Sequence, residues 1–248
     1  MKPVPSKPVS PKPALFSLMP LNIAQLTGQS QSHLQELFPG HFLHRDVVAA
    51  YLALVEMAAE EGIALRLASG FRSFDRQLAI WNAKARGERP VVGKDGGLVA
   101  MATLSEREKV FAILRWSALP GASRHHWGSD MDIWDSAAVA DNYQLQLTPD
   151  EYAADGPFAA CSHCLDGLLS RGKTEFFRPY IGGNAVGNTS GVAAEPWHLS
   201  YRPLATVCEQ ALTQDVLYPL IENTDICLQG AILENLDEIY SRFIGSQY

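Results

Sequence analysis

The sequence has no run of about 18 apolar residues, the length that a membrane-spanning helix requires, so no transmembrane segment is expected. It also lacks an excess of basic residues: 20 Lys and Arg stand against 27 Asp and Glu, and the formal net charge is -7. This balance argues against nucleic acid and anionic membranes as partners. A hydrophobic fraction of 47% and a charged fraction of 19% are typical of a soluble globular protein.

The N-terminus lacks a secretory signal, because no apolar core of about 7–15 residues follows its lysines. On this ground we expect a cytoplasmic protein, with a periplasmic or extracellular location reached by another route as the alternative. Residues 1–20 carry six prolines and little periodicity, which predicts an extended arm. Residues 21–248 are near the upper size for one hydrophobic core, and we expect them to form a single domain.

Cysteine is scarce, with four residues in 248. Cys161 and Cys164 have the two-residue spacing of a structural zinc or redox pair. However, Cys208 and Cys227 are far along the chain and form no second pair at zinc-ribbon spacing. Reduced, half-buried thiols are therefore the favoured interpretation, and pairing outside the cytoplasm is the alternative.

Two short segments supply the residue types of a catalytic zinc site. The first contains His125 and Asp132, and the second runs from Glu195 to His198. Catalytic zinc usually takes three protein ligands from His, Asp, Glu or Cys and leaves the fourth position to water. His125, Asp132 and His198 can fill the three places. Glu195 would be the base that takes the proton of the water.

The spacing between these residues constrains the local structure. His125 and Asp132 are seven apart, which on a helix is a rise of roughly 10 Å, too far for two ligands that each lie about 2 Å from one ion. We therefore expect a loop that turns at Gly128, followed by a strand from Met131 to Trp134 that returns Asp132 to His125.

The second segment also needs an irregular backbone. Residues three apart on a regular strand point to opposite faces, so Glu195 and His198 can face one metal only if the chain bends between them. Pro196, beside the expected start of a strand, is compatible with such a bend.

At this point the sequence resembles a known family. Ser-x-His-x-x-Gly-x-x-x-Asp followed by Glu-x-Trp-His is the pattern of the D-Ala-D-Ala carboxypeptidases of the vancomycin-resistance type, which belong to the LAS zinc metallopeptidases (lysostaphin, D-Ala-D-Ala peptidases, sonic hedgehog). A third block, Ser69 to Ser73, matches the Ser-Gly-Tyr-Arg-Ser of the family with Phe71 in place of Tyr. The blocks occur in the order of the family. The resemblance implies a family-like core over about residues 46–202 and a C-terminal helical extension over residues 203–248.

The resemblance implies an α+β fold, in which a small antiparallel sheet carries the zinc site and is flanked by helices. It implies that Arg72 stabilises the oxyanion of the reaction, which suits a guanidinium that donates parallel hydrogen bonds and stays charged. Gln77 matches a glutamine that contacts the peptide substrate. Ser123 matches a serine that helps to hold the terminal carboxylate of the substrate. Trp197 is expected to pack under His198 and shape the pocket, as part of the substrate-binding set, with a plain core tryptophan as the alternative.

The implied activity is removal of a C-terminal D-alanine from a peptidoglycan stem peptide or precursor by metal-activated water, with Zn²⁺ as the cofactor. The alternatives are an endopeptidase or an L,D-carboxypeptidase acting on wall peptides, or a non-catalytic zinc-binding relative. Retention of Glu195 and Arg72 argues against the last. The family spacing favours His125 over His126, and Asp132 over Asp130, as ligands. The sequence does not indicate an oligomeric state.

Periodicity and capping residues predict the other elements. We expect a short helical or turn segment over residues 21–40, with Leu34, Leu37 and Phe38 packed inward, and a following helix capped by Asp46. Asp135 is expected near the surface or behind the site. Tyr180 is expected in packing, with a place in the lining of the substrate cleft as the alternative. Residues 182–191 are expected to form a moving wall of the site. The remaining helices are expected over residues 74–86, 105–119, 158–170, 203–212, 216–221 and 231–243, and the remaining strands over residues 63–69 and 176–180.

Overall fold

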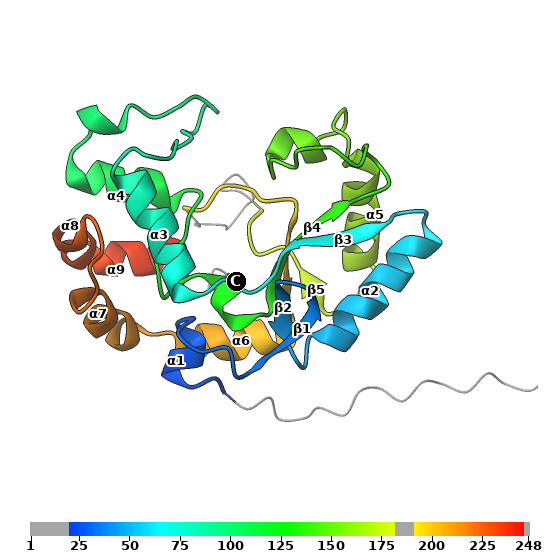
Figure 1. Ribbon diagram of the computed structural model, residues 1–248, viewed down its shortest axis with the longest axis horizontal. Coiled ribbons are helices and arrows are strands. Elements are labelled where there is room, and N and C mark those ends of the chain that lie inside the picture. The colour runs from blue at the N-terminus through cyan, green and yellow to red at the C-terminus, as the bar shows by residue number, and fades with distance from the viewer. Residues whose placement is uncertain (1–19, 182–190, 246–248) are drawn as a thin grey trace, which may run out of the picture.

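A four-stranded antiparallel sheet lies at the centre of the computed structural model, which describes residues 20–181 and 191–245 (Figure 1). Helices flank the sheet, and a separate two-stranded hairpin lies beside it. The expected α+β class is confirmed. Both the predicted arm of residues 1–20, apart from Pro20, and the predicted moving wall of residues 182–191, apart from Gly191, lie outside the described residues.

The order of the strands places the expected metal ligands side by side. The sheet runs β3 (Leu65–Ser69), β4 (Asp130–Asp135), β6 (His198–Tyr201) and β5 (Phe176–Phe177). Asp132 on β4 lies opposite Ser69 on β3 and opposite His198 on β6. Residues directly opposite each other on antiparallel strands share one face of the sheet. The register therefore brings two segments that are more than sixty residues apart to one point.

Two groups of helices flank this sheet (Figure 1). On one side, α2 (Val48–Glu60) packs on β3 and on α5 (Ala159–Ser170). On the other, α3 (Phe74–Ala85) packs on α4 (Glu106–Leu114), and α4 packs on α8 (Gln229–Glu234). The other helical segments are α1 (Ile23–Leu26), α6 (Arg202–Ala211), α7 (Gln214–Glu222), α9 (Leu236–Ile239), the 3₁₀ turns Met101–Thr103, Arg124–Trp127 and Pro149–Tyr152, and a π-helical turn Tyr240–Ile244. No helix in residues 20–181 and 191–245 is long and apolar enough to cross a membrane.

Helix α2 shows why these segments fold as they do. Tyr51, Leu54 and Ala58 recur at helical spacing and are buried in the core cluster shared with the sheet. Met131 and Ile133 supply the sheet side of this cluster and are fully buried.

Capping explains where two of the helices begin. Ser73 accepts a hydrogen bond from the backbone N–H of Arg76, and Ser105 forms the predicted capping box with Glu108. The prediction that Asp46 caps α2 is wrong. Val47 occupies the N-cap position, no side chain caps the helix, and the backbone N–H of Asp46 instead donates to His44. The chain turns between His44 and Val47, because the N–H of Val47 donates to the carbonyl of His44, and this turn starts the helix later than the sequence predicts.

The prediction of a helix or turn over residues 21–40 is correct for α1 and wrong for residues 34–40. Strands β1 (Leu34–Phe38) and β2 (His41–His44) form an antiparallel hairpin. Phe38 is not packed inward and is 39% exposed. The hairpin closes at Pro39 and Gly40, where Gly40 adopts a φ of +80° that glycine tolerates without strain.

The last predicted helix is interrupted in the structure. The predicted helix over residues 231–243 is divided at Asn235 into α8, α9 and the π-helical turn. Asn235 bonds the carbonyl of Ala231 through its side chain and accepts a hydrogen bond from Arg107 on α4. A tertiary contact thus accompanies the break, and such contacts cannot be read from helical spacing. Helix α4 likewise ends at Leu114 rather than near Leu119.

Candidate metal centre and substrate pocket

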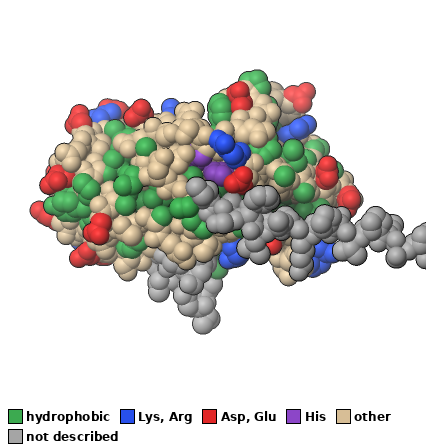
Figure 2. All heavy atoms as spheres, turned by 90° about the horizontal axis from the view of Figure 1, so that it is seen from below, with side chains coloured by type: hydrophobic (Ala, Val, Ile, Leu, Met, Phe, Trp, Pro, Cys, Tyr) green, Lys and Arg blue, Asp and Glu red, His purple; other side chains and the backbone are tan. Residues whose placement is uncertain are grey.

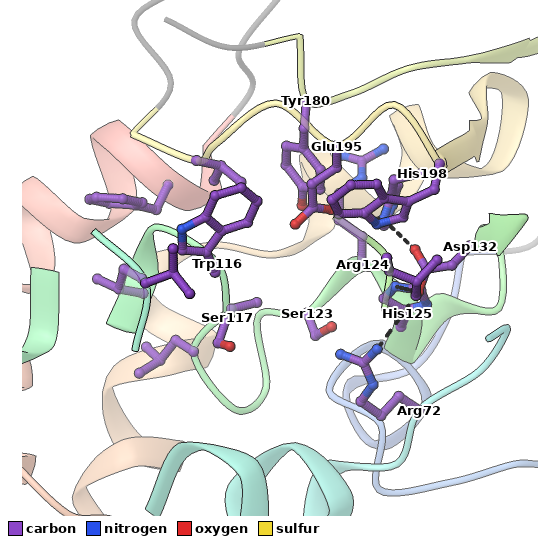
Figure 3. A pocket seen from close by; sticks show the side chains of 18 of the residues that line it. Arg72, Trp116, Ser117, Ser123, Arg124, His125, Asp132, Tyr180, Glu195 and His198 are labelled. Carbon is purple, nitrogen blue, oxygen red and sulfur yellow. Dashed lines mark ion pairs between the residues drawn. The ribbon is translucent and has the colours of Figure 1, made fainter. Parts of the chain in front are cut away.

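The structure brings the three predicted ligands together (Figure 3). One ligand atom from each of His125, Asp132 and His198 lies within 4.8 Å of the others, and all three side chains are buried. His125 Nε2 is 3.5 Å from Asp132 Oδ2, and His198 Nδ1 is 3.2 Å from Asp132 Oδ1. In the part of the chain that the structure describes, this is the one cluster of His, Cys, Asp or Glu arranged to hold a metal ion.

Hydrogen bonds on the far side of each ring fix which nitrogen faces the site. His125 Nδ1 lies 2.7 Å from the carbonyl oxygen of Gly70, to which it donates, so its Nε2 faces Asp132. His198 Nε2 lies 3.1 Å from Asp130 Oδ1, so its Nδ1 faces Asp132. Metal-binding histidines are commonly oriented in this way by a carbonyl or carboxylate on the other nitrogen.

The polar atoms of this cluster fit a cation. Asp132 Oδ1 and His198 Nδ1 are both buried and have no hydrogen-bond partner, although they face each other. A buried polar atom without a partner is costly, and a metal ion satisfies both lone pairs at once. Two imidazole nitrogens and a carboxylate oxygen are ligands that zinc accepts.

The electrostatics keep Asp132 ionised. Burial acts to raise the pKa of this carboxyl group, but the neighbouring His125 and His198 outweigh burial and hold the pKa well below its usual range. Burial likewise acts to lower the pKa of His198, while the carboxylates of Asp130, Asp132 and Glu195 raise it well above its usual value. The site is thus strongly attractive to positive charge.

His126, the alternative ligand, is committed elsewhere. Its Nδ1 lies 2.6 Å from the carbonyl oxygen of Arg72, and its Nε2 accepts from the N–H of Gly121. Burial lowers the pKa of His126 to about 3, so the ring is neutral. Both ring nitrogens of His126 are thus used in hydrogen bonds, and the side chain connects the backbone at Gly121 with the backbone at Arg72.

Asp130 lies behind His198 in a buried network that the sequence did not reveal. It accepts a hydrogen bond of 2.7 Å from Arg124 Nε, and Arg124 also donates to Ser200 and Glu209. Burial acts to raise the pKa of Asp130, but Arg124 and His198 outweigh it, so Asp130 remains ionised. An ionised Asp130 fixes the ring of His198.

Asp135 has a different place from the one expected. It is buried, and its carboxylate accepts from the backbone N–H groups of Ala64 and Ala137. It therefore closes the far end of β4 against β3, away from the metal cluster.

Glu195 reaches the cluster through the predicted bend. The backbone N–H of His198 donates to the carbonyl of Glu195, which forms a turn directly before β6. Glu195 Oε2 then lies 3.3 Å from His198 Nδ1, with its side chain 13% exposed. The N–H of Glu195 donates to the carbonyl of Tyr180, which fixes the turn from the other side.

Arg72 leaves the sheet where β3 ends and α3 begins. Its guanidinium donates to Gln77 Oε1 at 3.0 Å and lies 4.0 Å from Asp132 Oδ2. Gln77 is fully buried, and its amide nitrogen donates to the carbonyl of Ala118. Both ends of the Gln77 amide are thus used, and in this structure it holds Arg72 rather than facing the pocket.

A cavity of about 380 Å³ opens beside the metal cluster. In Figure 3, Arg72, Asp132 and His198 lie on one side of it, and Trp116 and Ser117 lie on the opposite side. On the face shown in Figure 2, histidine, basic and acidic side chains lie next to one another near the middle of the molecule. Ser123 and Trp197 also line the cavity, and Trp197 is buried against Tyr152, with 5.6 Å between ring centroids.

The lining residues that the sequence did not single out are Lys84, Phe243 and Ile244, and Tyr180 lines the cavity although packing was its favoured role. The ring centroid of Tyr180 lies 4.9 Å from that of His198. Lys84 lies seven residues after Gln77, which is the same face of α3, so helical spacing carried a signal for it. Phe243 and Ile244 come from the C-terminal extension, and no motif marked them.

The hairpin β1–β2 supports both loops of the site. The carbonyl of Phe42 accepts from the N–H of Phe71, and the N–H of His44 donates to the carbonyl of Gly128. A Cβ on Gly70 would lie 2.4 Å from the oxygen of Phe42, and one on Gly128 would lie 2.6 Å from the nitrogen of His44. Both glycines are therefore required by close backbone contacts.

The four cysteines are free thiols, as the favoured interpretation predicts. Burial raises the pKa of Cys161 to about 12 and also raises the pKa of Cys164. Neither belongs to the metal cluster.

The fold places a buried His-Asp-His cluster, arranged as a metal ion requires, next to a glutamate. The family model of VanY, the D-alanyl-D-alanine carboxypeptidases, matches residues 40–204. The chain belongs to this family, and the resemblance noted in the sequence is confirmed. The family match supports a carboxypeptidase-type peptidase that acts on peptidoglycan.

Two uncharacterized proteins of Haemophilus influenzae are also similar. One is 44% identical over 105 residues, which cover 41% of this chain and 72% of that protein. The other is 33% identical over 126 residues, which cover 51% of this chain and 92% of that protein.

Among solved structures, similar chains include a variant of the vancomycin-resistance D,D-pentapeptidase VanY from a VanB-type cassette in complex with Zn(II). It is 22% identical with a TM-score of 0.48, and the similarity covers 80% of this chain and 88% of that chain. The LD-carboxypeptidase LdcB is 22% identical with a TM-score of 0.46, and the similarity covers 80% of this chain and 72% of that chain.

Proposed function

We propose that this protein is a zinc-dependent carboxypeptidase that removes a C-terminal D-alanine from peptidoglycan-type peptides. The observation that carries the proposal is that two buried atoms of Asp132 and His198 face each other without a hydrogen bond, beside Glu195, in a chain of the VanY family. Lone pairs that converge in this way serve a cation, and a carboxylate next to them serves proton transfer.

His125, Asp132 and His198 would hold the zinc ion. When bound there, zinc acts as a Lewis acid that polarises a carbonyl and lowers the pKa of water. The protein supplies the groups that orient the three ligand side chains. Gly70 and Asp130 hold the two rings in place, so the triad needs little rearrangement to bind metal.

Glu195 is the general base of the proposed reaction. Its carboxylate lies at the mouth of the triad and is only partly exposed, so it can accept a proton from a water molecule in the cavity. It then delivers that proton to the amine of the departing D-alanine.

Arg72 is the oxyanion-stabilising group. Gln77 and the backbone bond to the carbonyl of His125 fix it at the edge of the triad, where a guanidinium can donate to a negatively charged oxygen. Ser123 and Trp197 form part of the wall against which the peptide lies.

The test is mass-spectrometric detection of free D-alanine from a wall pentapeptide ending in D-Ala-D-Ala, with added Zn²⁺ and with a chelator. A tetrapeptide with a single D-Ala after its L-residue is assayed in parallel. We expect release from the pentapeptide that stops with chelator. Release from the tetrapeptide alone would replace the proposal with an L,D-carboxypeptidase, and internal cleavage would replace it with an endopeptidase.

A further inference from the structure

Lys84 carries a charge on the cavity wall that the catalytic scheme does not use. It lies in the last turn of α3 and lines the cavity, and its Nζ donates a 2.7 Å hydrogen bond to Ser117 Oγ. Ser117 lies across the cavity from His198 and Asp132 (Figure 3). The ammonium group is therefore attached to the wall that faces the metal triad.

The other cations of the cavity wall are matched by acidic groups. Arg124 forms ion pairs with Asp130 and Glu209, and Arg72 lies 4.0 Å from Asp132. Lys84 has no carboxylate within ion-pair distance among residues 20–181 and 191–245. Its bonded partner is a neutral hydroxyl group.

The surroundings of Lys84 disfavour an ammonium group that has no acidic partner. Burial lowers the pKa of Lys84, and Arg89 and Arg72 lower it further, while Glu195 raises it. A partly buried ammonium without a counter-ion is stabilised by any anion that enters the cavity. Ser117 can accept from Lys84 and donate its own proton to the same anion.

A carboxypeptidase must distinguish a chain end from a chain interior, and the free α-carboxylate is the group that differs. Ser123, the serine expected to hold this group, is neutral and cannot compensate its charge. An endopeptidase has no need of a buried cation at this place, because an amide follows the scissile residue in its substrate.

We propose that Lys84, held by Ser117, binds the terminal carboxylate of the substrate and restricts the enzyme to free C-termini. This inference rests on the proposed function for the identity of the substrate. The recognition of a carboxylate by Lys84 does not depend on hydrolysis, and the test uses binding for that reason.

The experiment is calorimetric titration of the Glu195→Ala protein, in the presence of Zn²⁺, with diacetyl-L-Lys-D-Ala-D-Ala and with its C-terminal carboxamide. The same pair of ligands is titrated against Lys84→Met and Lys84→Arg made in the Glu195→Ala background. Methionine keeps the length and packing of the side chain without charge, and arginine keeps the charge. Lys173→Met, at an exposed position after α5, is the matched control.

We expect the free acid to bind about 10- to 100-fold more tightly than the carboxamide, as a charge-assisted hydrogen bond provides. This preference should disappear in Lys84→Met, persist at least in part in Lys84→Arg and remain unchanged in Lys173→Met. An equal preference in Lys84→Met, or no preference with Lys84 present, would overturn the inference. The wild-type protein could hydrolyse no peptide while the Lys84-dependent preference for the free acid is still found. That result would contradict the proposed reaction and support carboxylate binding by Lys84.

Discussion

The Nδ1 atom of His198 and the Oδ1 atom of Asp132 face each other at 3.2 Å, and neither has a hydrogen-bond partner. His198 lies on β6 and Asp132 on β4, and these strands are paired so that the two residues are directly opposite each other. The sheet register, and not a flexible loop, thus sets the separation of these two atoms. A ligand pair fixed by strand pairing is preorganised for an ion.

Removal of one member of this pair should abolish stable zinc binding. His198→Ala takes away a nitrogen ligand, and we expect zinc affinity to fall by at least about 100-fold, more than the loss of a supporting hydrogen bond alone would cause. The measurement is metal content after dialysis against a weak chelator, with His163→Ala as an off-site control. A full complement of zinc in His198→Ala would remove this residue from the ligand set.

Replacement of the proposed base should separate binding from chemistry. Glu195→Ala leaves the triad intact, so zinc content should match that of the wild type. Release of D-alanine should fall by about 10²- to 10⁴-fold, the usual contribution of a positioned proton-transfer group. The rate and the metal content are measured on the same preparation. Undiminished release would assign the proton transfer to another residue.

The carboxylate of Asp130, which lies behind His198, should affect zinc affinity without binding the metal. Asp130→Asn keeps a hydrogen-bond acceptor for the ring but removes the charge that Arg124 and His198 share. We expect zinc affinity to fall about 10- to 100-fold, as is typical for supporting carboxylates. Competition with a fluorescent zinc chelator gives the affinity, and Asp141→Asn at an exposed position is the control. Equal affinities in the two variants would leave Asp130 with a purely structural role.

Acid should weaken the fold through a histidine outside the site. Burial, with a smaller effect from His44, outweighs a backbone interaction with His126 and lowers the pKa of His33 from 6.5 to about 4. The unfolded chain takes up a proton there near pH 6.5, and the folded chain does so only near pH 4. Stability is therefore complete above pH 6.5 and declines as the pH falls from 6.5 to 4, by on the order of 2 kcal/mol.

The measurement is urea unfolding at pH 7 and at pH 4.5, for the wild type and for His33→Phe. The variant keeps an aromatic ring beside Phe71 and removes the titrating group. Its free energy of unfolding should fall less between the two pH values. A loss as large as that of the wild type would place the acid sensitivity in other groups.

The sequence predicted the parts of the site that depend on short-range geometry. His125, Gly128 and Asp132 lie within eight residues, so ligand distance alone excludes a helix and requires a loop and a strand. The bend at Pro196 follows from the same reasoning. Ser73 and Ser105 were found because a cap acts within three residues of its own position.

Features that depend on contacts between distant segments were not predictable in this way. Asp130 matters because β6 places His198 beside it, and Arg124 because α6 places Glu209 within its reach. The hairpin at residues 34–44 lacks a strong alternating pattern, and its role appears only where Phe42 meets Phe71. These relationships are set by packing, which sequence spacing does not encode.

The wall formed by Phe243 and Ile244 belongs to a segment beyond residues 40–204, the part of the chain that matches the family. The proposed reaction centre and this part of the cavity wall thus lie in separate parts of the sequence. Mutation can remodel the π-helical turn Tyr240–Ile244, and with it the size of peptide that the cavity accepts, while every proposed catalytic residue stays unchanged. In the proposed enzyme, selection can therefore change the range of substrates independently of the catalytic residues.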